Sequence, residues 1–245
     1  VATPPPPTIT PIAQQPLVIH GVGDVNFDPR YIGRFVDDGY AIAFSGMDGL
    51  FRFDDVTVMN LECSPSDLGV PIDKDYIFRC DPAALAIAAE AGVEVANLAN
   101  NHGQDYGPAA LLDGIENLNR AGLLAVGVGK NLEAATSPAL FEIGAHKVAV
   151  LGFGGVHPAS SWLATSDTPG MADGDDIDQM VSAVSSAAAS ADIVVVSIHW
   201  GTELVTDPTE SDRALAEAMI SAGADVVFGH HPHRLGELEW IAGRP

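Results

Sequence analysis

Three of the eight histidines in this chain lie within four positions, in the stretch FGHHPH at residues 228–233. They directly follow the apolar run ADVVFG, which is typical of a buried β-strand. A His-x-His pattern places two imidazole rings on the same side of an extended segment, and the proline between them stiffens it. Imidazole is a common ligand of Zn²⁺ and other transition metals. The stretch therefore predicts a metal site, and it leaves open whether His230 or His231 partners His233.

Four other apolar runs end in residues of the same chemical types. They offer Asp24 and Asn26 after residues 17–23, Asn60 and Glu62 at the end of 56–60, Asn100, Asn101, His102 and Asp105 after 93–99, and His199 after 192–198. Each pattern alone also fits an ordinary Asx turn or a hydrogen-bonded core histidine. In open α/β sheets, however, ligands bind beyond the carboxyl ends of the strands, where all of these residues fall. The mixture of carboxylate, amide and imidazole suits two metal ions that share a carboxylate and activate a water.

The runs that position these residues alternate between strand-like and helix-like patterns. Strands are expected at 17–23, 56–60, 93–99, 123–128, 147–153, 192–200, 224–229 and 237–242, and helices at 81–92, 107–122, 175–190 and 209–223. Several of the strands are apolar almost throughout, as strands buried on both faces are. This alternation predicts a layered α/β fold with at least part of its sheet parallel. Residues 154–174, rich in Gly, Ser, Thr and Pro, are expected to form a long loop.

Composition narrows the classes of partner. The 245 residues are 47% apolar and 18% charged, which is ordinary for a folded domain. The formal net charge of −22 would repel a nucleic-acid backbone or an anionic membrane surface, so neither is expected as a partner. High acidity is most simply a solubility feature, and attraction of cations gains weight only where carboxylates converge. No apolar run approaches the roughly 20 residues needed to span a bilayer.

The first 16 residues, VATPPPPTITPIAQQP, have the composition of a Pro-rich extended linker, and residues 17–245 are expected to form one domain. Such tethers commonly follow a removed signal or a membrane anchor, so the chain is expected to be exported and to work outside the cell or at its surface. Cys63 and Cys80 would form one disulfide or remain two free thiols, and their spacing does not decide between these.

Several motifs together resemble the CapA family of poly-γ-glutamate capsule synthesis proteins, whose fold is similar to that of calcineurin-like metallophosphoesterases. The motifs are GDVN, NLE, NLANNHGQDYG, GVGKNLEAA, VAVLGF, SIHWGTEL and FGHHPH, spread in order over residues 17–242. The resemblance implies an α/β fold in which a β-sandwich of two mixed sheets is flanked by helices, in four αββα layers. It also implies a metal centre at one edge of the sheets. The family continues past its last strand with a Ser-Leu-Gly-Asn-Phe segment, so a C-terminal segment is expected to be missing from 17–245.

Carried over residue by residue, the resemblance implies two groups of site residues. The metal ligands would be Asp24, Asn26, Glu62, Asn101, His199, His231 and His233, with His102 as the catalytic acid and Asp105 orienting it. His230, Asn60 and Arg79 are further candidates, and Arg79 and Lys74 would either steer an anionic substrate or be ordinary surface charges. Asn26 stands where phosphoesterases have a histidine, and Glu62 where they have a bridging aspartate. Phosphoester hydrolysis is therefore carried over only as an analogy.

These observations favour an exported hydrolase with two divalent ions, Mn²⁺, Zn²⁺ or Fe²⁺, acting on a phosphoester or on amide-linked glutamyl or cell-wall material. The alternative is a non-hydrolytic component of capsule-polymer assembly or export whose metal centre binds the polymer. A third possibility is a binding module that has lost its chemistry. The expected partners are an anionic polymer or a small-molecule substrate, together with other membrane proteins of capsule synthesis. Contact with a membrane would occur only through an N-terminal anchor.

Overall fold

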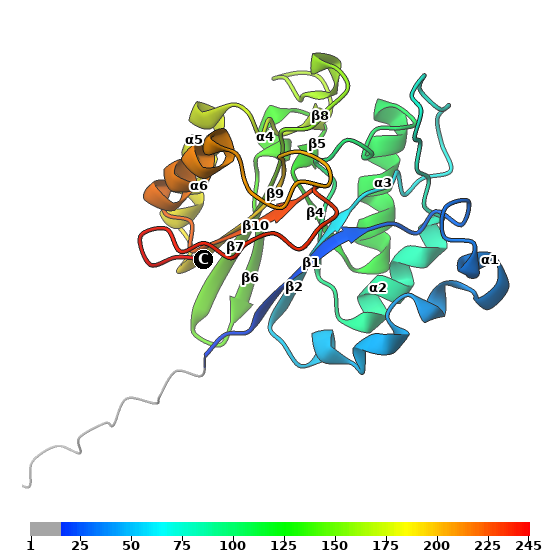
Figure 1. Cartoon of the computed structure of the whole chain (residues 1–245), viewed down its shortest axis with the longest axis horizontal. Coiled ribbons are helices and arrows are strands. Elements are labelled where there is room, and N and C mark those ends of the chain that lie inside the picture. Colours follow the sequence, from blue (N-terminus) through cyan, green and yellow to red (C-terminus); the bar gives the residue numbers. More distant parts are fainter. Residues whose placement is uncertain (1–15) are drawn as a thin grey trace, which may run out of the picture.

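The structure, a computed structural model, describes residues 16–245, so the predicted linker at 1–16 lies outside the described residues except for its last position. Two four-stranded sheets lie face to face (Figure 1). The first sheet has the order β1 (Ile19–Val25), β2 (Val56–Leu61), β3 (Val95–Asn97), β4 (Leu124–Val126), and all its strands are parallel. The second has the order β10 (Val226–His230), β9 (Ile193–His199), β7 (His146–Gly154), β6 (Ala139–Ile143). Its strands are parallel except for β6, which pairs antiparallel with β7.

Helices cover the outer face of each sheet (Figure 1). Helices α2 (Leu85–Ala91) and α3 (Pro108–Ala121) pack on the first sheet, and α5 (Ile177–Ala188) and α6 (Glu210–Ala222) pack on the second. The smaller elements are α1 (Arg34–Asp38), α4 (Leu132–Ala135), the β5 (Val128–Gly129) and β8 (Gly170–Met171) pair, and single 3₁₀ turns at Tyr40–Ile42, Ser45–Met47, Leu50–Arg52, Pro82–Ala84 and Ser160–Trp162. None of the helices within residues 16–245 is long and apolar enough to cross a membrane.

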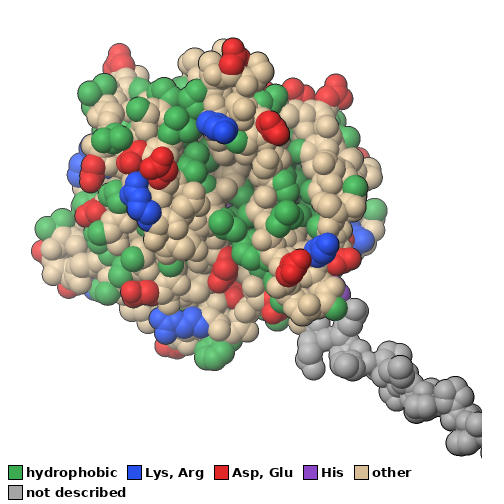
Figure 2. All heavy atoms as spheres, turned by 180° about the vertical axis from the view of Figure 1, so that it is seen from behind, with side chains coloured by type: hydrophobic (Ala, Val, Ile, Leu, Met, Phe, Trp, Pro, Cys, Tyr) green, Lys and Arg blue, Asp and Glu red, His purple; other side chains and the backbone are tan. Residues whose placement is uncertain are grey.

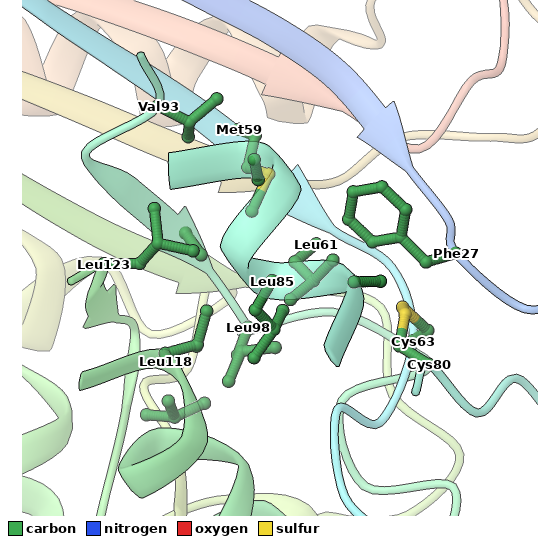
Figure 3. Packing of buried hydrophobic residues seen from close by; sticks show 14 of the residues in the cluster. Phe27, Met59, Leu61, Cys63, Cys80, Leu85, Val93, Leu98, Leu118 and Leu123 are labelled. Atoms are coloured by element: carbon green, nitrogen blue, oxygen red, sulfur yellow. A yellow bond between two sulfur atoms is a disulfide. The ribbon is translucent and has the colours of Figure 1, made fainter. Parts of the chain in front are cut away.

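Alternation along each strand divides the core into three apolar layers. In β2, Val56 and Val58 face the other sheet, whereas Met59 and Leu61 face the helices, as the two-residue period of a strand requires. Figure 3 shows Met59 and Leu61 on the helix side, beside Leu85 of α2. The second sheet divides in the same way between the inter-sheet layer and the layer under α5 and α6. Because each sheet is buried on both faces, the expected αββα arrangement is confirmed.

Local signals account for the ends of the main helices. Pro108 occupies the first turn of α3, and Gly122 ends that helix in a left-handed conformation with φ 88°. Helix α6 begins at a capping box in which Thr209 and Asp212 each accept a hydrogen bond from the other's backbone N–H. These caps explain why the predicted helix ranges agree with the structure to within one or two residues for both elements.

Three expectations about the elements need correction. Residues 237–242 form no strand, and this stretch instead runs as coil with a tight turn in which Ile241 pairs with Arg244. Strand β6 was not expected, because its sequence ALFEI contains Glu142 and lacks a long continuous apolar run. The first sheet is wholly parallel, whereas two mixed sheets were expected. The long loop at 154–174 is present, with one 3₁₀ turn and β8 inside it.

Acidic side chains are distributed over much of the face shown in Figure 2. Some of these Asp and Glu side chains adjoin one another, and fewer Lys and Arg side chains lie among them. A dispersed charge of this kind favours solubility and does not by itself form a cation site. A cation site must therefore be sought where carboxylates are brought together by the fold.

The two cysteines are joined. Cys63 lies two residues after β2, and Cys80 lies just before the 3₁₀ turn at Pro82–Ala84. Both are fully buried beside Phe27 (Figure 3). The disulfide closes the loop of residues 64–79 onto the end of a central strand of the first sheet. Of the two possibilities left by the sequence, the structure has the disulfide.

Replacing both Cys63 and Cys80 by alanine is expected to lower the free energy of unfolding by about 3 kcal/mol, the entropy of closing a loop of this size. Urea unfolding of the double variant and the wild type under oxidising conditions measures the difference. Equal unfolding midpoints would show that the loop is held by its other contacts alone.

Candidate metal centre

The carboxyl ends of five strands meet at one end of the sandwich. Asn60 in β2 connects the two sheets there. Within its own sheet, its Nδ2 donates to Asp24 Oδ1 of β1 at 2.7 Å. The same Nδ2 lies 3.1 Å from Nδ1 of His199, the last residue of β9. Asn60 and His199 are both fully buried. The Asn60 amide therefore fixes the ligand candidates of the first sheet relative to those of the second. The sequence placed Asn60 among the candidates, and the structure gives it a connecting position.

Glu62 lies at the middle of the group. Its Oε1 is 3.8 Å from Nε2 of His199, and its Oε2 is 4.0 Å from Nδ1 of His233. Each carboxylate oxygen therefore faces a different histidine. Donor atoms of Glu62, His231 and His233 all lie within 4.8 Å of one another.

Two further contacts flank Glu62, one on each side. His233 Nδ1 is 2.9 Å from Asp24 Oδ2, and His199 Nε2 is 3.0 Å from Asn101 Oδ1. Metal–ligand distances of about 2.1 Å place neighbouring ligands of one ion about 3 Å apart, so both separations suit a shared ion. The structure thus brings Asp24 and His233 to one side of Glu62, and Asn101 and His199 to the other.

The structure separates the roles of the two adjacent histidines. His230 ends β10 with its Nε2 2.9 Å from Ser197 Oγ, and burial lowers its pKa to about 4. His231 has a positive φ of 97°, which turns the chain so that its ring comes within 4.7 Å of the His199 ring. Its backbone N–H donates to Asp24 Oδ2 at 3.3 Å. His231, rather than His230, therefore accompanies His233 and Glu62.

The electrostatics of Glu62 indicate what the centre can bind. Its Oε1 is buried and has no hydrogen-bond partner among the described residues, and the same holds for His231 Nδ1. Burial, together with the nearby carboxylates of Asp24 and Glu203, raises the pKa of Glu62 to about 9. A buried carboxylate in this position is stabilised by a cation or by a proton. The donor set of carboxylate, amide and imidazole therefore fits divalent metal ions.

His102 and Asp105 follow β3 and lie next to this group. His102 Nδ1 is 2.6 Å from Asp105 Oδ2, and His102 Nε2 points toward Glu62 Oε1 at 4.0 Å. The ring of Phe78 stacks on the imidazole with a centroid distance of 3.9 Å. Burial lowers the pKa of His102. One nitrogen is thus oriented by a carboxylate while the other faces the centre, the arrangement that an acid or base group needs.

Two expected residues lie away from these contacts. Asn26 Oδ1 accepts the backbone N–H of Asp28 at 2.7 Å, which closes an Asx turn. Arg79 lies over the Tyr106 ring at 3.5 Å and donates to Leu68 O at 2.6 Å. In the described part of the chain, neither side chain has a hydrogen bond or ion pair with Glu62 or the histidines. Within this structure both stabilise loops that surround the centre.

Other residues were not foreseen in their present roles. Lys74 was expected only as a steering or surface charge, yet its ammonium is 2.7 Å from Asp105 Oδ1. Phe78 and Ser197 had no signal in the sequence, because their roles depend on contacts between distant segments. His157 groups with Asp173 and Asp175 instead of approaching Glu62, and the three form a second set of potential ligands.

The raised pKa of Glu62 predicts a pH dependence for the protein without metal. A carboxyl whose pKa rises from 4.5 in the unfolded chain to about 9 in the folded one stabilises the fold at low pH, and this contribution is lost as pH increases between those values. In the presence of a chelator, wild type is therefore expected to lose stability from about pH 5 to about pH 9, relative to Glu62→Gln. Thermal unfolding of both proteins measures this, and a constant difference across the range would contradict it.

The chain is similar to known proteins of capsule synthesis. A family model, bacterial capsule synthesis protein PGA_cap, matches residues 18–245. PGA biosynthesis protein CapA of Bacillus subtilis (strain 168) is 31% identical over 226 residues, which are 91% of this chain and 59% of that protein. Capsule biosynthesis protein CapA of Bacillus anthracis is 37% identical over 170 residues, which are 68% of this chain and 41% of that protein. The chain thus spans about half the length of the curated relatives it matches.

A solved structure, a putative 5'-nucleotidase from Staphylococcus aureus, superposes with a TM-score of 0.48 and 17% identity over 80% of this chain and 39% of the other. Similarity at this level does not extend to function. The family model, in contrast, includes every residue of the candidate metal centre. The chain therefore belongs to the bacterial capsule synthesis protein PGA_cap family.

Proposed function

We propose that this domain is a divalent-metal-dependent hydrolase that acts in the synthesis of poly-γ-glutamate capsule. The observation that carries the proposal is the buried, unpartnered Oε1 of Glu62, which lies among histidines contributed by both sheets. A fold does not maintain an uncompensated carboxylate in such a place without a counter-charge. A metal ion supplies that charge and, when bound, lowers the pKa of a coordinated water toward neutrality.

Two ions are proposed because the donors divide into two sets around Glu62. Asp24, His231 and His233 would hold one ion, and Asn101 and His199 the other, with one oxygen of Glu62 directed to each set. Asn60 holds Asp24 and His199 in place through its amide. Mn²⁺, Zn²⁺ and Fe²⁺ are all compatible with this donor set.

His102 is the proposed proton carrier. Its Nδ1 is held by Asp105, so its Nε2 is the nitrogen free to give or take a proton at the centre. Burial among Phe78 and the loop of residues 64–79 excludes water from one face of the ring. These side chains hold and orient the group whether or not a substrate is present.

The setting follows from the relatives. Proteins named for PGA biosynthesis and capsule biosynthesis are similar to this chain, so an anionic glutamyl polymer or its precursor is the proposed substrate. The buried Cys63–Cys80 disulfide is compatible with an oxidising compartment, which supports a location outside the cytoplasm. Membrane proteins of capsule synthesis are the proposed partners.

A non-hydrolytic role in polymer assembly is the second candidate. It is favoured by Asn26, whose Oδ1 is engaged by Asp28, since one expected ligand of the first ion is then lost. An ion with one protein ligand fewer would keep a coordination position open to a carboxylate of the polymer. Metal bound without turnover on any substrate would support this alternative.

His231→Ala is expected to lower the affinity for metal by about 100-fold or more, since even residues behind a ligand contribute about 10–100-fold. His230→Gln is the matched control, because its side chain faces Ser197 rather than Glu62. Isothermal titration with Mn²⁺ or Zn²⁺, together with elemental analysis of the bound metal, measures both. Equal loss in the two variants, or no metal in wild type, would contradict the assignment.

Hydrolysis is tested with p-nitrophenyl phosphate and γ-glutamyl peptides in the presence of Mn²⁺ or Zn²⁺. If His102 carries the proton, His102→Asn lowers the turnover of whichever substrate reacts by about 100-fold or more while metal binding is retained. Glu62→Gln is expected to abolish both turnover and metal binding. Metal-loaded wild type that turns over neither class would refute the hydrolase. An unchanged rate in His102→Asn would refute His102 as the proton carrier.

A further inference from the structure

Lys74 occupies an unusual place for a lysine. It lies on the loop of residues 64–79, which the Cys63–Cys80 disulfide closes, and only 19% of its side chain is exposed. Its ammonium contacts Asp105 Oδ1 at 2.7 Å and also donates to the backbone carbonyl of Asn101. The Trp162 ring lies 5.6 Å from it on another side. An ammonium with these partners is part of the structure around the centre and is not a free surface charge.

Hydrogen bonding at Asp105 shows what this contact does. The carboxyl has no exposed area, and its Oδ2 accepts the backbone N–H of Phe78 at 2.7 Å and lies 2.6 Å from His102 Nδ1. Its Oδ1 accepts from Lys74. Ion pairs of Asp105 within residues 16–245 are with Lys74 and His102, so Lys74 is its permanently charged partner. Oδ1 is thus held by Lys74, whereas Oδ2 is held by the Phe78 N–H and faces His102.

The hydrogen-bond contacts of Asp105 then decide where the His102 proton lies. A carboxylate only accepts hydrogen bonds, and an ammonium only donates them. The short contact between Asp105 Oδ2 and His102 Nδ1 therefore requires the proton on Nδ1. Lys74 Nζ lies 3.2 Å from the same Nδ1. With the proton on Nδ1 both nitrogens are donors, and Asp105 accepts from each of them. Nε2, directed toward Glu62, is left with its lone pair.

We propose that Lys74 is a positioning residue that holds the Asp105 carboxylate in place through its Oδ1 and thereby fixes the proton of His102 on Nδ1, so that Nε2 presents its lone pair to the metal centre. The consequence for turnover rests on the proposed hydrolytic function, but the position of the proton is a property of the folded protein. Substrate anchoring, the role expected for a scarce cation near a site, fits less well, because the ammonium is already engaged by Asp105 and Asn101.

The test is the tautomer of His102 in the Zn²⁺-loaded full chain, read from long-range ¹H–¹⁵N spectra of ¹⁵N-histidine-labelled protein at about pH 7. The His102 signals are assigned by their loss in His102→Gln. Wild type is expected to carry the proton on Nδ1. Lys74→Met is expected to shift a measurable fraction to Nε2, whereas Lys74→Arg, which keeps the charge, restores the wild-type pattern. Lys130→Met, at an exposed lysine elsewhere, is the matched control.

A wild-type spectrum with the proton on Nε2 overturns the proposal without any variant, so the test does not depend on the folding of Lys74→Met. An unchanged tautomer in a folded Lys74→Met protein, or in Lys74→Gln if the methionine variant does not fold, also overturns it. Where a substrate is turned over, kcat of Lys74→Met is expected to fall about tenfold or more with KM little changed, as when a residue behind a reacting group is removed. A rise in KM alone would instead indicate substrate anchoring. Absence of turnover in wild type refutes the hydrolase and leaves the tautomer result standing.

Discussion

The centre depends on a carboxylate that the fold buries between two sheets. Glu62 follows β2, a strand whose residues are all buried, so its side chain emerges where water cannot solvate it. Its Oε1 faces His199 of the second sheet and His102, which follows β3 of the first, and its Oε2 faces His233 after β10. Desolvation of Glu62 opposes burial of its negative charge, and this cost is removed only by a proton or by cations. The arrangement of the surrounding ligands follows from that constraint.

The two sheets must keep a fixed relative position if their side chains are to surround Glu62. The side-chain amide of Asn60 contributes to this at the site itself. Asn60 contacts Asp24 within its own sheet and His199 across the interface. Away from the site the two sheets pack through valines such as Val58 and Val195. These apolar contacts set the distance between the sheets, and they contribute no polar contact that would orient the site residues. A centre built at the joint between two rigid sheets is less adaptable than one built on loops. His231 and His233, which lie on the loop after β10, are tied to this frame through Asp24.

Much of this arrangement was predictable from the sequence, since strand ends in a parallel sheet share one edge. Asp24, Glu62, Asn101 and His199 each follow an apolar run, and the structure brings them together as that rule requires. The choice between His230 and His231 was not predictable, because it depends on the positive φ at His231. A histidine rarely adopts this backbone conformation, and the sequence does not signal it. Lys74 was underestimated for a related reason: its partners are separated from it by about thirty positions and meet only through the closed loop. Asn26 was expected as a metal ligand, and in this structure its side chain closes a local turn. A residue after a strand can form its hydrogen bond in such a turn as well as at a site.

Crystals of the metal-loaded protein, measured at the absorption edge of Zn²⁺ or Mn²⁺, test the central claim most directly. The account predicts two anomalous peaks on opposite sides of Glu62, one about 2 Å from donor atoms of His231 and His233 and the other about 2 Å from His199 and Asn101. A centre without a peak at Glu62, or one occupied only at His157, Asp173 and Asp175, would contradict it.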